Sequence, residues 1–253
     1  MASPAGIFQT ARQRLEHPRH QFRFLDFFIM VFVVVLLISN LVGAKICAVG
    51  PFRISGAQLL FPVTYIFGDI FTEVYGYAGA RRAIWMGFFA SALMALFGML
   101  VVALPAAPEW RDQAAFETVF NFVPRMVAAS LIAYWAGEFT NSFVMAKMKV
   151  WSGGKRLWMR TIGSTVAGQL VDSILVMTII FAGSQSFATI GNLILSGYLG
   201  KVLYEAAMTP VTYLVVNWLK RTEGVDVYDV ATNFSPFATG AEGEEFRPVA
   251  PAG

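Results

Sequence analysis

Five carboxylic acids of this 253-residue chain lie inside long apolar runs, where an ionisable side chain is rare and costly. The five are Asp69, Glu73, Glu138, Asp172 and Glu205. One lysine, Lys201, lies in the same run as the last of them. Five acids against one lysine favour a site for a cation, or for a neutral ligand that is rich in hydrogen-bond donors.

Polar neighbours accompany these acids at helical spacing. Asp69 and Glu73 are four residues apart, so they share one face of a helix. The same spacing rule groups Glu138 with Asn141 and Ser142, and Gln169 with Asp172 and Ser173. Besides the acids themselves, Glu205 included, further candidate binding residues are Asn40, Phe67, Lys201 and Tyr204.

Some of these charges also have structural interpretations. Lys201 and Glu205 are four residues apart and can pair with each other, and Glu73 lies within two turns of Arg81. Asp172 and Glu138 have no such partner in their own helices, so a functional role is favoured most strongly for these two.

The composition indicates the elements that must hold these residues. The chain is 57% hydrophobic and only 14% charged, whereas soluble domains carry about 25% charged residues. The mean hydropathy is +0.59. High hydrophobicity excludes a disordered chain, and the lone Cys47 excludes a disulfide scaffold. A polytopic membrane protein remains.

We expect an all-α integral membrane protein that forms a six-transmembrane-helix bundle. A spanning helix needs about 20 mainly apolar residues. Six segments meet this requirement, at 25–44, 57–77, 83–104, 126–146, 161–182 and 193–219. At about 1.5 Å per residue, the five acids lie about 12–22 Å from the nearest basic residue on the cytoplasmic side. Four helices therefore send carboxylates towards a mid-membrane pocket.

The basic residues predict the orientation. With a cytoplasmic N-terminus, fourteen of the 19 Lys and Arg residues fall on the cytoplasmic side and three on the outside. We expect a cytoplasmic segment at 1–24, a transport domain at 25–221 and a polar, largely disordered cytoplasmic tail at 222–253. Residues 45–56 are expected to form a short outer hairpin. The positive charge then faces the lipid bilayer and calls for no nucleic acid.

The sequence contains none of the catalytic motifs that were considered. The only histidines are His17 and His20, before the first apolar run, so a serine–histidine protease within the membrane is excluded. The phosphate-binding motif of ATPases is absent. We predict no catalytic residue, no metal site and no cofactor.

Four motifs in order resemble the queuosine precursor transporter family, also called the vitamin uptake transporter family. The first is Asp69-Ile-Phe-Thr-Glu73-Val-Tyr75-Gly76-Tyr77. The others are Gly137-Glu138-Phe139-Thr140-Asn141-Ser142, Gly168-Gln169-Leu170-Val171-Asp172-Ser173 and Lys201-Val-Leu-Tyr204-Glu205. The resemblance covers roughly residues 25–230.

The resemblance implies a bacterial inner-membrane carrier, similar in fold to the substrate-binding components of energy-coupling-factor transporters. It implies import of 7-deazaguanines such as cyano- or aminomethyl-deazaguanine. Glu138 or Asp172 would then take the guanine-like edge, with Asn141 and Gln169 on the carbonyl and ring nitrogens. The substrate amine would face Asp69 or Glu73, and the substrate ring would stack on Phe67 or Tyr204.

Other functions remain open at this stage. The chain could be a substrate-capture subunit that depends on a separate ATPase partner, or a carrier or channel for another small cation or purine-like nutrient. The sequence also leaves a homodimer open.

Overall fold

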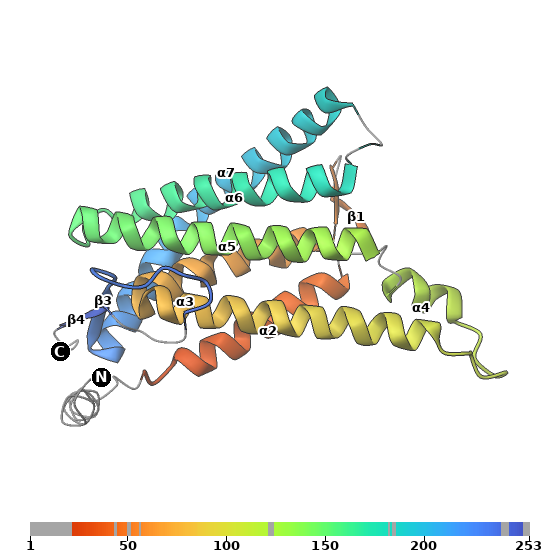
Figure 1. The fold of residues 1–253 in the computed structure, drawn as a ribbon, viewed down its shortest axis with the longest axis horizontal. Coiled ribbons are helices and arrows are strands. Elements are labelled where there is room, and N and C mark those ends of the chain that lie inside the picture. Colours follow the sequence, from red (N-terminus) through yellow and green to blue (C-terminus); the bar gives the residue numbers. More distant parts are fainter. Residues whose placement is uncertain are drawn as a thin grey trace, which may run out of the picture.

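The computed structural model describes residues 22–42, 45–49, 52–55, 57–120, 124–181, 183, 186–238 and 243–249, and its fold is mostly helical (Figure 1). Most of the expected segment 1–24 lies outside the described residues. The helices are α2 (Leu25–Val42), α3 (Ala57–Ala103), α4 (Gln113–Phe120), α5 (Pro124–Ser152), α6 (Leu157–Phe181) and α7 (Phe187–Glu223). The strands are β1 (Ile46–Val49), β2 (Phe52–Ser55), β3 (Val225–Tyr228) and β4 (Glu245–Pro248).

The surface of the helices is apolar, as a lipid environment requires. Three helical stretches of the described residues are long and apolar enough to cross a membrane, namely Leu25–Val42, Val63–Ala103 and Leu157–Ile179. Large apolar side chains point outward from the bundle, including Phe89 (67% exposed) and Leu214 (72% exposed). Water-soluble monomers rarely expose apolar surface on this scale. The chain is therefore a helical membrane protein.

Helix α3 is broken in the middle by Gly76, whose φ of 74° and ψ of 177° are not helical. In Figure 1 the orange half of α3 runs towards the end of the bundle that holds β3 and β4, and the yellow half runs back. A Cβ at Gly76 would lie 2.7 Å from Val227 Cγ1, so glycine is required by space as well as by φ. The two halves match the predicted segments 57–77 and 83–104, joined by a turn at one residue.

The remaining helices pack side by side through close contacts. α5 packs along α6, and α3 packs against α2, α5 and α7. Gly168 allows the closest approach, because a Cβ there would lie 2.8 Å from the carbonyl oxygen of Gly137. At the opposite end of the bundle from β3 and β4, β1 and β2 pair in an antiparallel hairpin with Ile46 opposite Ser55. This confirms the expected hairpin at 45–56.

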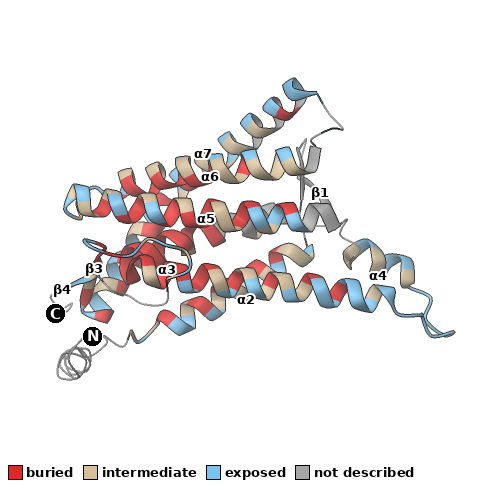
Figure 2. Ribbon diagram, in the orientation of Figure 1, coloured by how far each residue is buried: buried red, intermediate tan, exposed pale blue. Residues whose placement is uncertain are grey.

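The buried residues gather near the end of the bundle where β3 lies (Figure 2). There the segment after α7 packs against helix ends. Strand β3 pairs with β4 in antiparallel register, with Val225 opposite Pro248. Glu223, at the end of α7, accepts hydrogen bonds from the backbone N–H groups of Arg23 (2.8 Å) and Phe24 (2.9 Å), so it caps the start of α2.

Two further carboxylates from the same segment cap the second half of α3. Asp229 accepts from the N–H of Tyr77 (3.1 Å), and Glu244 Oε1 accepts from the N–H of Ala78 (3.1 Å). A helix N-terminus favours negative charge. Burial, and next the carboxylate of Asp229, nevertheless raise the pKa of Glu244 to about 8. Burial also raises the pKa of Asp229.

Candidate functional site

The interior of the bundle holds a group of polar side chains from four helices, which we call the central cluster. Its members are Asp69 from α3, Glu138 and Asn141 from α5, Gln169 and Asp172 from α6, and Lys201 and Glu205 from α7. Asp69 is completely buried, and Glu138, Asn141, Gln169 and Glu205 are each at most 6% exposed. The structure therefore brings together most of the acids and amides that the sequence nominates.

A hydrogen bond and an ion pair join members of the central cluster across helices. Asn141 Nδ2 donates a hydrogen bond to Asp69 Oδ1 (3.1 Å). Lys201 Nζ lies 2.5 Å from Asp172 Oδ2 in an ion pair. Lys201 thus pairs with Asp172 of the neighbouring helix, and the pairing with Glu205 considered from the sequence is not formed. Asp172, which has no partner in its own helix, finds one in α7.

Many oxygens of the central cluster have no hydrogen-bond donor. Among the residues that the structure describes, Asp69 Oδ2, Asn141 Oδ1, Gln169 Oε1 and both carboxylate oxygens of Glu205 are buried without a partner. Buried polar atoms in native proteins are nearly always paired, so such a concentration calls for an explanation. All five atoms are acceptors, so the central cluster is suited to a ligand that supplies donors.

Small residues let these side chains converge. A Cβ at Gly68 would lie 2.7 Å from Glu138 Oε2, so the carboxylate of Glu138 occupies space that only a glycine leaves free. A Cβ at Gly137 would lie 2.9 Å from the Cβ of Asp172. The glycines beside the acids therefore allow α3, α5 and α6 to pack closely enough for their polar side chains to meet.

Two tyrosines belong beside the central cluster and were not nominated from the sequence. Tyr65 lies beside Gln169, and its ring centroid is 6.0 Å from Lys201 Nζ. Tyr134 is buried near Glu138. Each tyrosine precedes an acid by four residues, Asp69 in one case and Glu138 in the other. The same helical spacing that grouped the acids with amides could therefore have found both.

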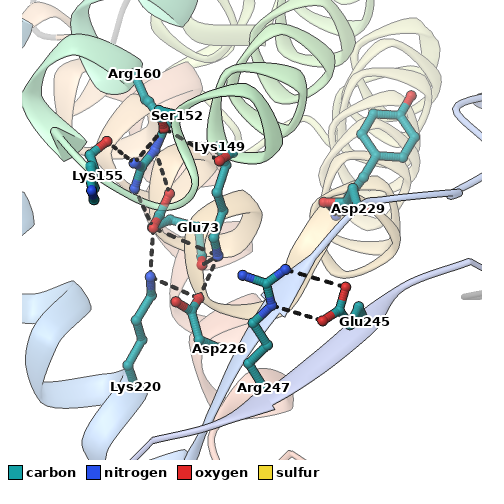
Figure 3. A network of polar contacts seen from close by, with 11 residues as sticks. Glu73, Lys149, Ser152, Lys155, Arg160, Lys220, Asp226, Asp229, Glu245 and Arg247 are labelled. Carbon is teal, nitrogen blue, oxygen red and sulfur yellow. Dashed lines mark hydrogen bonds and ion pairs between the residues drawn. The ribbon is translucent and has the colours of Figure 1, made fainter.

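Glu73 lies elsewhere, at the centre of a second group that we call the Glu73 network (Figure 3). Its members are Glu73, Lys149, Arg160, Lys220 and Asp226. This group joins α3, α5, α6, α7 and β3 near the Gly76 turn. The structure therefore separates Glu73 from Asp69, although they are one helical turn apart.

The carboxylate of Glu73 is fully satisfied. Arg160 binds it with two nitrogens, at 2.6 Å (Nη2 to Oε1) and 3.2 Å (Nε to Oε2), and Lys220 Nζ lies 2.6 Å from Oε1. Lys149 donates to the backbone carbonyl of Glu73 and pairs with Asp226, each at 2.5 Å. These are structural ion pairs, and the sequence had counted the three basic residues only as orientation signals.

Three other residues nominated from the sequence are Phe67, Asn40 and Tyr204. Phe67 packs in an aromatic cluster, with ring centroids 6.0 Å from Phe28 and 6.1 Å from Phe32. Asn40 Nδ2 donates to Ser91 Oγ at 3.4 Å, which links α2 to α3. Tyr204 is half-buried on α7 next to Glu205.

Comparisons with known proteins agree with the motif resemblance. A family described as "Putative vitamin uptake transporter" matches residues 55–215, a range that contains the whole central cluster. A protein of Bacillus subtilis (strain 168) named "Probable queuosine precursor transporter" is 28% identical over 169 residues, which cover 66% of this chain and 73% of the relative. No solved structure matches. Because the family match covers more than half of the residues, the chain belongs to this family of transporters and is not an enzyme.

Proposed function

We propose that the protein is a membrane carrier that imports 7-deazaguanine precursors of queuosine through the central cluster. The observation that carries the proposal is that the buried amide oxygens of Asn141 on α5 and Gln169 on α6 have no donor and lie in the same cluster as the buried carboxyl group of Glu138. A 7-deazaguanine has ring N–H groups and an exocyclic amino group, and the aminomethyl form adds an ammonium. Such a molecule supplies the donors that these oxygens lack. The name of the Bacillus subtilis relative supports the same substrate class.

Within the cluster we assign substrate binding to Glu138, Asn141 and Gln169. A carboxylate accepts two parallel N–H donors from a guanine-like edge, and Glu138 suits this role because Asp172 is already held by Lys201. The unpaired side-chain oxygens of Asn141 and Gln169 accept from further N–H groups of the ligand. The ion pair of Asp172 and Lys201 lies at the border of the site.

We further propose six membrane spans with both termini in the cytoplasm of a bacterium, in the inner membrane. The two halves of α3 with α2, α5, α6 and α7 give six helical segments whose directions alternate in Figure 1, which supports this count. The excess of Lys and Arg at the end that holds β3 supports the orientation. A fold similar to the substrate-binding components of energy-coupling-factor transporters follows from the family resemblance.

The single cysteine offers a direct test of orientation. Cys47 is partly exposed and lies on β1, which is proposed to face the outside. A membrane-impermeant maleimide added to intact cells should label Cys47. In a Cys47→Ser background, Ser152→Cys at the end of α5 should be labelled only after the membrane is permeabilised. The opposite pattern would reverse the proposed orientation.

Transport itself is tested by uptake of labelled precursor in cells that cannot synthesise it. Wild type should restore uptake, and Glu138→Gln should abolish most of it while remaining in the membrane at normal amounts. Glu109→Gln, which removes an exposed acid from the loop after α3, is the matched control and should transport normally. Normal uptake by Glu138→Gln would show that the substrate site lies elsewhere.

A transport assay with purified protein in liposomes distinguishes a stand-alone carrier from a subunit that needs an ATPase partner. The proposal expects exchange of labelled for unlabelled precursor across the liposome membrane without any other protein. Saturable binding with no exchange would favour the capture subunit. Ion conductance without saturable binding would favour a channel.

A further inference from the structure

Asp69 and Glu205 form a pair of carboxyl groups that substrate binding as proposed above does not use. Asp69 is fully buried and Glu205 is 1% exposed, and the two side chains lie next to each other between α3 and α7. Of their four oxygens, only Asp69 Oδ1 receives a hydrogen bond, from Asn141 Nδ2. The other three have no donor among the described residues.

Two ionised carboxylates cannot hydrogen-bond to each other, because each is only an acceptor. One proton changes this, since a protonated carboxyl donates an O–H to its neighbour. Pairs of buried carboxyls that share one proton are a known solution to this problem. The placement of Asp69 against Glu205 is therefore the geometry of a proton site.

No described cation is placed to neutralise the carboxyl groups of Asp69 and Glu205. The titratable groups nearest the pair are Tyr65 on α3 and Glu138 on α5, and beyond Glu138 lie Tyr134 on α5, Asp172 on α6 and Lys201 on α7. Lys201 is the one cation in this set, and it lies 2.5 Å from Asp172. Asp69, Glu138 and Glu205 are left without a cation among the residues that the structure describes.

The described residues offer no cluster of ligands typical of a divalent metal ion as the missing charge. In the described part of the chain, no three acidic, histidine or cysteine side chains are placed to hold one. The unpaired amide oxygen of Asn141, which is 6% exposed, lies on the same side chain that bonds to Asp69. Asn141 thus connects the carboxyl pair to the oxygens assigned to the substrate.

We propose that Asp69 and Glu205 share an exchangeable proton and that this proton is carried inward with the substrate. The inference rests on the proposed carrier function and names its driving ion. One proton enters the pair from outside and leaves to the cytoplasm in each import cycle, and no other bond forms or breaks. Import of a neutral deazaguanine therefore moves one positive charge. Asn141 couples proton binding to substrate binding, because it contacts Asp69 and faces the substrate.

The test uses the full chain in liposomes with labelled cyano-deazaguanine as the neutral probe. Exchange at equal pH on both sides reports transport alone. A pH gradient, acid outside and free of Na⁺, should then drive accumulation well above equilibrium and alkalise the outer medium. Exchange without accumulation, or accumulation driven by a Na⁺ gradient instead, would overturn the inference and leave the carrier function standing. Absence of exchange would overturn both.

Two variants test the residues. Glu205→Gln and Asp69→Asn mimic the protonated groups, so each should lose accumulation driven by the pH gradient while retaining measurable exchange. Glu109→Gln should keep both activities. A full response to the pH gradient in Glu205→Gln and Asp69→Asn would place the proton elsewhere. Loss of exchange in both would show that the pair does more than carry a proton, and would equally overturn the assignment.

Discussion

Two buried acids of α3, one helical turn apart, have opposite surroundings. Glu73 is surrounded by Arg160, Lys149 and Lys220 (Figure 3), whereas Asp69 has one amide donor and faces another acid. Both are completely buried. The residues that the structure describes thus supply three cations to Glu73 and none to Asp69. A saturated carboxylate has no capacity left for a ligand, whereas an unsaturated one has.

The contrast also separates stability from transport. A buried ion pair holds its elements in place because removing one partner leaves an unpaired charge. The Glu73 network joins four helices and β3 in this way. The central cluster holds acceptors without donors, which favours binding of a ligand at some expense in stability. Substitutions in the Glu73 network should therefore lower stability, whereas substitutions in the central cluster should lower transport.

The largest expected effect is on folding, from Glu73→Gln. The substitution leaves Arg160, Lys149 and Lys220 without their shared carboxylate, so we expect a loss of about 3–5 kcal/mol of stability. Thermal unfolding in detergent measures it. The matched control is Glu245→Gln, because Glu245 pairs with Arg247 at the exposed surface, at 2.8 Å. The control should cost little stability, because solvent screens an exposed ion pair. Similar small losses in both variants would contradict the assigned role of Glu73.

The next effect is on transport, from Glu138→Gln. Loss of a hydrogen bond to a charged group is worth about 1.5–3 kcal/mol, which corresponds to a roughly 10- to 100-fold fall in uptake at low substrate concentration. The stability of the protein should stay the same or rise, because the substitution removes a buried acid that forms no ion pair within the described part of the chain. A variant that unfolds early would instead assign Glu138 to the structural group.

A smaller effect tests the ion pair that borders the central cluster. Lys201→Met leaves Asp172 unpaired, and since the Lys201 side chain is 30% exposed we expect a loss of only about 1–2 kcal/mol. Adding Asp172→Asn should restore most of that loss. Thermal unfolding of both single variants and the double variant measures the coupling. Additive losses would show that the two charges do not stabilise each other.

The sequence predicted the helices because their apolar runs are long. The expected segment 25–44 corresponds to Leu25–Val42, and 161–182 corresponds to Leu157–Phe181. The prediction for 126–146 was shorter than Pro124–Ser152, because α5 continues past its apolar run into Lys147 and Lys149. Hydropathy locates the apolar part of a helix, but polar residues can extend it beyond that part.

The partners of the acids were harder to predict. Spacing within one helix pairs Lys201 with Glu205, but the structure pairs Lys201 with Asp172 of α6. Arg160 and Lys220 read as orientation signals, and they also neutralise Glu73 from two other helices. Contacts between helices depend on packing, which a single sequence does not encode in its periodicity. The sequence predicted that the acids converge, but it did not predict which of them are paired with cations and which are not.

The smallest effect concerns the segment that caps the second half of α3. Docking raises the pKa of Glu244 from 4.5 to about 8, so its stabilising contribution is complete below about pH 4.5 and is lost as the pH rises through about 8. Amide hydrogen exchange at Ala78, corrected for its intrinsic pH dependence, should therefore accelerate between about pH 6 and pH 9. Glu244→Gln keeps an acceptor for Ala78 and should remove most of this dependence. The contribution of Asp229 has the same sign and should remain. Protection that increases with pH would mean that the ionised form of Glu244 is the one that caps the helix, and this capping contact would then resemble Glu73 rather than Asp69.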